Sequence, residues 1–152
     1  MNAHDLDRGV AAYHEAGHAV IAILLDVPFS SMDIAPDGLG GCVDFLYYDR
    51  LDLIDKRQFL CDIAGPIAER WFRARVHRDE DGLDPEILET YYVLRRGFIE
   101  ETALQLLEFY MQLAGDILKL HWSQVQLIAE TLLERNRLTR REVVDVLATS
   151  HP

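Results

Sequence analysis

The chain has 152 residues, of which 49% are hydrophobic, so it is long enough to bury the core of one domain. Its 26 acidic and 15 basic residues give a formal net charge of −11, which argues against binding to nucleic acids and to anionic membrane surfaces. No repeat, low-complexity tract or linker interrupts the sequence. We therefore expect a single domain spanning residues 1–152.

Three features favour a cytoplasmic protein without membrane contact. The longest apolar run, Ala19 to Leu25, is far too short to span a bilayer. The N-terminal residues are acidic and lack the basic and then apolar order of a signal peptide. The two cysteines, Cys42 and Cys61, show no spacing typical of a metal site or of a disulfide framework. We expect both thiols to be reduced and buried.

The first predicted helix runs from Leu6 to Asp26 and contains the motif His14-Glu15-Ala16-Gly17-His18. Histidines at positions i and i+4 share one helix face, so both imidazoles can bind one Zn²⁺ at about 2.0–2.1 Å. Glu15 lies beside that face and can contact a metal-bound water. Burying three such groups in an apolar helix is costly without a partner, which favours a metal over incidental surface histidines.

A small hairpin and a long helix are predicted next. Residues Ser31–Ala35 and Cys42–Tyr47 resemble strands, and the segment Pro36–Gly41 between them is dense in turn residues. Apolar residues then recur at spacings of three and four from Leu51 to Val76, which predicts a second helix. The pair Gly65-Pro66 inside it predicts a kink.

An acidic loop, residues 78–83, precedes a further helical region. The order Asp84-Pro85-Glu86 is typical of a helix start, with proline at the first helical position. From there the pattern remains helical to Leu133, with breaks predicted near Gly97 and Gly115. Thr139 to Glu142 form a capping box that predicts a final short helix. The elements together predict a mostly α fold with a small β-hairpin or sheet beside the histidine helix.

Four segments, in the same order, give the chain its resemblance to the protease domain of FtsH-type zinc proteases. Ala12–Val20 resembles the zinc helix of that family, and Asp37–Val43 resembles its glycine-rich hairpin. Ile63–Glu69 and Trp122–Val146 are similar to later helices. The resemblance implies a helical zincin-like metalloprotease domain. Because the sequence contains no P-loop and no transmembrane segment, it implies a peptidase module without the ATPase module and membrane anchor of the family.

The family completes its zinc site with an aspartate at the start of a helix, and Asp84 is the matching position. The residues on both sides of Asp84 depart from the family pattern. An aspartate before proline is also a good helix N-cap without any metal. The resemblance favours Asp84 as the third ligand, followed by Glu69 and then by Asp81 and Glu80. Glu69 is expected instead to orient a ligand histidine or to pair with an arginine.

The resemblance implies a zinc-dependent, ATP-independent metallopeptidase that hydrolyses peptide bonds in small or unfolded polypeptides. His14, His18 and Asp84 would hold the metal, and Glu15 would act as general base on zinc-bound water. The strand Val43–Leu46 either holds an extended substrate or is simply a core strand. The partner expected is a peptide or unfolded protein, and both a homo-oligomer and a separate ATPase partner stay open. The alternative is a non-catalytic zinc-binding or regulatory module derived from the same fold.

Overall fold

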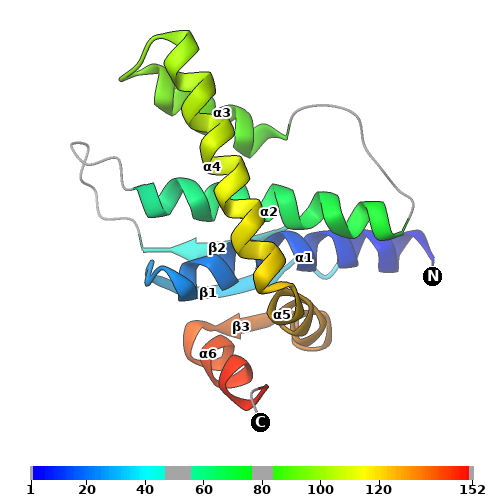
Figure 1. Cartoon of the computed structure of the whole chain (residues 1–152). Coiled ribbons are helices and arrows are strands. Elements are labelled where there is room, and N and C mark those ends of the chain that lie inside the picture. The colour runs from blue at the N-terminus through cyan, green and yellow to red at the C-terminus, as the bar shows by residue number, and fades with distance from the viewer. Residues whose placement is uncertain (1, 47–55, 77–83, 151–152) are drawn as a thin grey trace.

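The computed structural model describes residues 2–46, 56–76 and 84–150 of the chain. Their elements follow in the order α1 (Ala3–Leu24), β1 (Phe29–Ile34), β2 (Gly41–Phe45), α2 (Lys56–Arg75), α3 (Pro85–Arg95), α4 (Glu100–Leu120), α5 (Trp122–Arg135), β3 (Arg137–Thr139) and α6 (Arg140–Thr149) (Figure 1). The predicted mostly α fold with a small sheet is confirmed.

Helices α1 and α2 lie side by side and run in opposite directions (Figure 1). Nearly all side chains of α1 between Gly9 and Ala22 are buried, as its apolar sequence predicts. A Cβ atom at Gly17 would lie 2.7 Å from both the carbonyl oxygen of Ala64 and the Cβ of Ala68 in α2. The missing side chain therefore lets the two helices approach closely at the level of the histidine motif.

The sheet has the strand order β2-β1-β3, and both pairings are antiparallel. Met32 in β1 pairs with Val43 on one side and with Leu138 on the other, and both Met32 and Leu138 are fully buried. The predicted hairpin is confirmed, although Tyr47, its predicted last residue, lies outside the described residues. Strand β3 was not predicted, because three residues are too few for a recognisable alternation.

Most of the predicted helices are present. Helix α1 begins at Ala3, before the predicted Leu6, because Asn2 caps it by accepting a hydrogen bond from the Asp5 N–H at 2.8 Å. The first residues of the second predicted helix, 51–55, lie outside the described residues. Helix α2 continues through Gly65 and Pro66, so the kink there stays a prediction.

The two predicted breaks in the following helical region had different outcomes. The break near Gly97 is confirmed, since it lies between α3 and α4. The break near Gly115 is wrong, because Gly115 lies inside α4 and that helix ends at Leu120. A glycine costs a helix only about 1 kcal/mol, and burial of the neighbouring Ala114 and Leu118 offsets that cost.

Aromatic rings pack α1, α2 and α5 against one another. Tyr13 stacks on Phe72 with 4.3 Å between ring centroids, and Trp122 lies 5.7 Å from Tyr13. Trp71 meets Trp122 edge to face. These contacts stabilise the position of the histidine helix within the core.

The two cysteines differ in their burial. Cys61 is buried in α2 as expected, whereas the prediction of burial is wrong for Cys42, which is exposed. Alternation along β2 turns Val43 into the core and therefore turns Cys42 outward.

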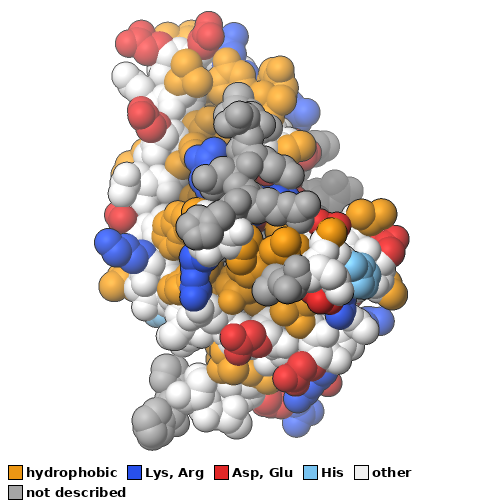
Figure 2. Space-filling model, turned by 90° about the vertical axis from the view of Figure 1, so that its right-hand side faces the viewer, with side chains coloured by type: hydrophobic (Ala, Val, Ile, Leu, Met, Phe, Trp, Pro, Cys, Tyr) orange, Lys and Arg blue, Asp and Glu red, His pale blue; other side chains and the backbone are white. Residues whose placement is uncertain are grey.

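The surface carries both signs of charge. Figure 2 shows acidic and basic side chains interspersed with hydrophobic ones on one face of the molecule. Among residues 2–46, 56–76 and 84–150, no helix is long and apolar enough to cross a membrane.

Candidate metal centre

Helix α1 presents His14 and His18 on one face, as their spacing predicts. Their ring centroids lie 4.7 Å apart, with the ring planes nearly perpendicular. The side chain of Glu15 follows on the same helix and is buried, with 5% of its surface exposed. The backbone geometry of one helix therefore places two imidazoles and a carboxylate together.

A hydrogen bond to the backbone of α2 orients the His18 ring. Its Nδ1–H donates to the carbonyl oxygen of Cys61 in α2 at 2.6 Å. A backbone carbonyl only accepts hydrogen bonds, so Nδ1 carries a proton and Nε2 is the nitrogen that faces the site. Gly65 makes this position possible, because a Cβ atom there would overlap the His18 ring.

His14 is held in a similar way by a carboxylate. Its Nδ1 lies 2.7 Å from Glu69 Oε2, and Arg73 Nε donates to the other carboxylate oxygen at 2.8 Å. The chain of contacts from Arg73 through Glu69 to His14 orients the His14 ring, with Nε2 facing the site. Of the two roles expected for Glu69 other than ligation, orienting a histidine and pairing with an arginine, the structure shows both.

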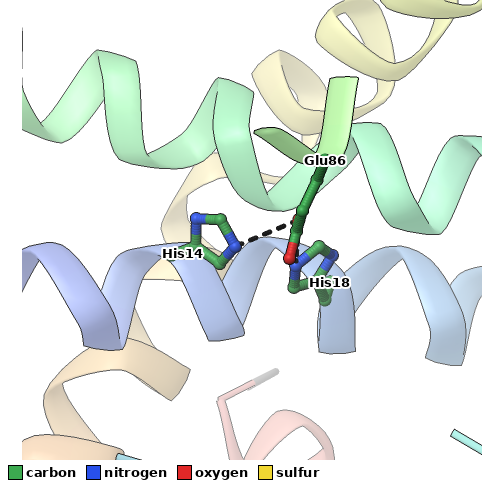
Figure 3. A group of neighbouring side chains, drawn as sticks. All are labelled: His14, His18 and Glu86. Carbon is green, nitrogen blue, oxygen red and sulfur yellow. Dashed lines mark hydrogen bonds and ion pairs between the residues drawn. The ribbon is translucent and has the colours of Figure 1, made fainter. Parts of the chain in front are cut away.

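Glu86 places its carboxylate between the two histidines. It projects from the first turn of α3 towards the face of α1 that carries both imidazoles (Figure 3). Its Oε2 atom lies 3.2 Å from His14 Nε2 and 3.1 Å from His18 Nε2. No reasoning from the sequence singled out Glu86. The helix start at residue 84 was predicted, but not which of its carboxylates would face the histidines.

The other candidate ligands lie differently. Asp84 is the N-cap of α3, as its position before proline predicts, and accepts a hydrogen bond from the Glu86 N–H at 2.8 Å. Ligand atoms of Asp84, Glu69 and His14 all lie within 4.8 Å of one another, in a group that does not contain His18. Asp84 as a zinc ligand stays a prediction. Asp81 and Glu80 lie outside the described residues.

Electrostatics couple these groups strongly. Burial alone would lower the pKa of His14, but its hydrogen bonds to Glu69 and Glu86 outweigh burial and raise it to about 10. Burial would raise the pKa of Glu86, whereas hydrogen bonds to His14 and His18 hold it below its ordinary value. Burial raises the pKa of Glu15, and the two histidines offset only part of that shift. The environment of Glu86 thus favours positive charge at the histidine Nε2 atoms.

The donor set fits zinc. Two imidazole nitrogens and a carboxylate oxygen are the ligands of many catalytic zinc sites, which keep a fourth position open. In each histidine the ring nitrogen opposite the site is bonded to a separate group, as is usual for histidines that bind metals. The described residues can therefore hold Zn²⁺ through His14, His18 and a carboxylate from the start of α3.

A cleft of about 420 Å³ opens next to this cluster. His14, Glu15, Glu69 and Glu86 line it together with the hairpin turn Gly38–Gly41. A Cβ atom at Gly41 would lie 2.8 Å from the Cγ of Glu15, so the hairpin approaches the motif closely. The cleft gives a bound molecule access to Glu15, His14 and Glu86.

No protein-family model matches the chain. The chain is similar to the "ATP-dependent zinc metalloprotease FtsH" of Thermus thermophilus, with 31% identity over an alignment of 176 residues. The alignment covers 90% of this chain and 28% of the FtsH chain, so the chain spans less than a third of the length of that relative. The likeness supports a distant relationship to FtsH and, at that coarse level, a metallopeptidase-related fold.

Proposed function

We propose that the chain is a zinc-dependent peptidase that hydrolyses peptide bonds in small or unfolded polypeptides without ATP. The observation that carries this proposal is the convergence of His14 Nε2 and His18 Nε2, each ring held through its other nitrogen, beside a cleft that His14 and Glu15 line. The similarity to a zinc metalloprotease supports the same chemistry.

Each residue of the motif has a role in this proposal. His14 and His18 hold the zinc together with a carboxylate from the start of α3. When bound there, the metal acts as a Lewis acid that makes water acidic and polarises a carbonyl group. Glu15 takes the proton from the attacking water and then passes it to the leaving amine. Burial of Glu15 at the cleft wall keeps its carboxylate in one place for both transfers.

The position of β2 supports a polypeptide as substrate. Within the described residues β2 pairs with β1 alone, so its other edge is unpaired there. Strand β2 begins at Gly41, directly beside Glu15. An extended polypeptide that adds to this edge by backbone hydrogen bonds brings its own carbonyl groups to the motif. Side chains Cys42 and Asp44 are exposed along the strand, which favours this role over that of an internal core strand.

The alternative function is a non-catalytic zinc-binding or regulatory module. The altered sequence around Asp84 favours it, because a protein that no longer needs to catalyse a reaction can lose the family pattern at this position. Both functions predict bound zinc, and only the peptidase needs the proton transfers of Glu15. The base is therefore the residue that separates the two functions.

The test substitutes Glu15→Gln, which removes the base and keeps the size of the side chain. The variant should keep its zinc and its fold while cleavage of an unfolded casein, measured without ATP, falls about 10²- to 10⁴-fold. Chelation should abolish cleavage by the wild type, and added zinc should restore it. A wild-type protein that binds zinc and cleaves no unfolded substrate would support the binding module. Cleavage that survives Glu15→Gln would contradict the proposed mechanism.

A further inference from the structure

We propose that Glu86, and not Asp84, is the third ligand of the zinc, and that Asp84 is a positioning residue for Glu86. This inference rests on the proposed function, in which zinc binds at His14 and His18. It reverses the assignment that the family resemblance implies for the start of α3, and the contacts of the two carboxylates carry it.

The first argument is geometric. Ligand atoms at the corners of a tetrahedron around zinc, with bonds of about 2.0–2.1 Å, lie roughly 3.3 Å from one another. Glu86 Oε2 lies 3.2 Å from His14 Nε2 and 3.1 Å from His18 Nε2. Both distances are thus close to what a shared zinc requires, and ligand atoms of His14, His18 and Glu86 all lie within 4.8 Å of one another. Asp84 belongs to no group of ligand atoms that contains both histidines.

The second argument concerns charge. With a proton on Nδ1, a neutral imidazole directs the lone pair of Nε2 at whatever lies opposite. Here both Nε2 atoms face the carboxylate of Glu86, and three electron-rich atoms repel one another unless positive charge lies between them. Without a metal, protons on the two Nε2 atoms supply that charge through their contacts with Glu86. One divalent cation in place of the two protons would neutralise all three atoms at once.

The third argument concerns what holds each group. Cys61 orients His18, Glu69 orients His14, and Asp84 fixes the first turn of α3 by accepting the Glu86 N–H. Each of the three ligands therefore has one supporting partner from outside the ligand set, which is typical of metal sites in proteins. The Asp84 carboxylate already accepts a hydrogen bond from the Glu86 backbone as the helix cap, which suits it to the supporting role.

Two substitutions separate the roles. Asp84→Asn removes a carboxylate but keeps the cap, because asparagine caps helices as well as aspartate does. Glu86→Gln removes the other carboxylate and keeps its shape. Zinc affinity is measured by competition with a chromophoric chelator, and the absorption bands of the Co²⁺-substituted protein report the ligand set. Glu89→Gln, an exposed change on the same helix, is the matched control, and circular dichroism checks that every variant is folded.

Glu86→Gln should weaken zinc binding more than about 100-fold, beyond the usual effect of a supporting residue, and should change the Co²⁺ bands. Asp84→Asn and Glu89→Gln should stay within about 10-fold of the wild type, with unchanged bands. Strong loss in Asp84→Asn with normal binding in Glu86→Gln would overturn the assignment and leave the proposed function standing. Zinc loss in Glu86→Gln combined with an inactive wild type would support the assignment and contradict the peptidase. A wild-type chain that binds no zinc overturns both.

Discussion

At the scale of single residues, the position of the His18 ring depends on the absence of a Cβ atom at Gly65. Gly65 lies in the middle of α2, where a glycine ordinarily costs stability relative to alanine. Its lack of a side chain leaves the space that the His18 ring occupies, and the ring then reaches the Cys61 carbonyl oxygen. The glycine therefore lowers the stability of α2 but allows the His18 imidazole to take a fixed position.

Gly65→Ala should displace the His18 ring and break its bond to Cys61. We expect zinc affinity to fall about 10- to 100-fold, as for the loss of a supporting group. Overpacking should also lower the free energy of unfolding by about 1–3 kcal/mol. Chelator competition and chemical denaturation measure the two effects.

Gly115→Ala is the matched control for this change, because it is also a glycine inside a helix. Its added Cβ atom would meet only Trp71, at an ordinary 3.9 Å. It should leave zinc affinity unchanged and stabilise the protein by roughly 0.5–1 kcal/mol. Normal zinc binding in Gly65→Ala would show that the ring finds another position and that the glycine has no role in the site.

The same scale shows what could be predicted of the site. The proximity of His14, Glu15 and His18 follows from the repeat of one helix, so the sequence alone predicted it. The choice between Asp84 and Glu86 depends on how α3 meets α1 across the fold. Both carboxylates belong to one helix start and lie two residues apart, and no local pattern distinguishes them. The family resemblance pointed to the shorter one, whereas the contacts favour the longer one.

At the scale of elements, the junction between β3 and α6 combines a strand with a helix cap. Thr139 ends β3, and its side chain accepts a hydrogen bond from the Glu142 N–H at 3.2 Å. Glu142 in return accepts from the Thr139 N–H at 2.7 Å. The capping box was predicted because its four-residue signature is local. Strand β3 was not, since it exists only by pairing with β1.

Thr139→Ala should lower the free energy of unfolding by about 1 kcal/mol, because the first turn of α6 loses its side-chain cap. For a chain of this length, that loss corresponds to a decrease in Tm of about 2–4 °C. Thr139→Ser keeps the hydroxyl and should remain close to the wild type. Zinc content should be normal in both variants, because the junction lies outside the metal cluster. Thermal melts and metal analysis of both variants check the prediction. Equal Tm values for the Thr139→Ala and Thr139→Ser variants would contradict it.

At the scale of the whole molecule, α3 connects to the remainder of the fold mainly through α2 and α4 (Figure 1). Glu86 links it to the histidine helix through contacts with His14 and His18. A zinc ion bound by these residues would join two elements, α1 and α3, that are far apart in sequence. Metal binding would then also stabilise the packing of α3 against the remainder of the fold.

Chelation of the zinc-loaded protein should therefore destabilise it measurably. Zinc at 100 times its dissociation constant contributes about 2.7 kcal/mol, which for this chain length corresponds to roughly 5–10 °C in Tm. Hydrogen exchange should accelerate first in the opening turns of α3. Amides of α5 and α6 should change least, because these helices lie away from the metal cluster. Thermal melts and exchange with and without chelator provide the two measurements.

Glu86→Gln tests whether the metal acts on α3 through this one side chain. With Glu86 as the tie between α3 and the metal, chelation should shift the Tm of this variant far less than that of the wild type. Its α3 amides should already exchange fast in the presence of zinc, and Glu89→Gln should behave like the wild type. If chelation instead shifts the Tm of Glu86→Gln as much as that of the wild type, the zinc stabilises α1 alone. Helix α3 would then depend only on its packing against α2 and α4.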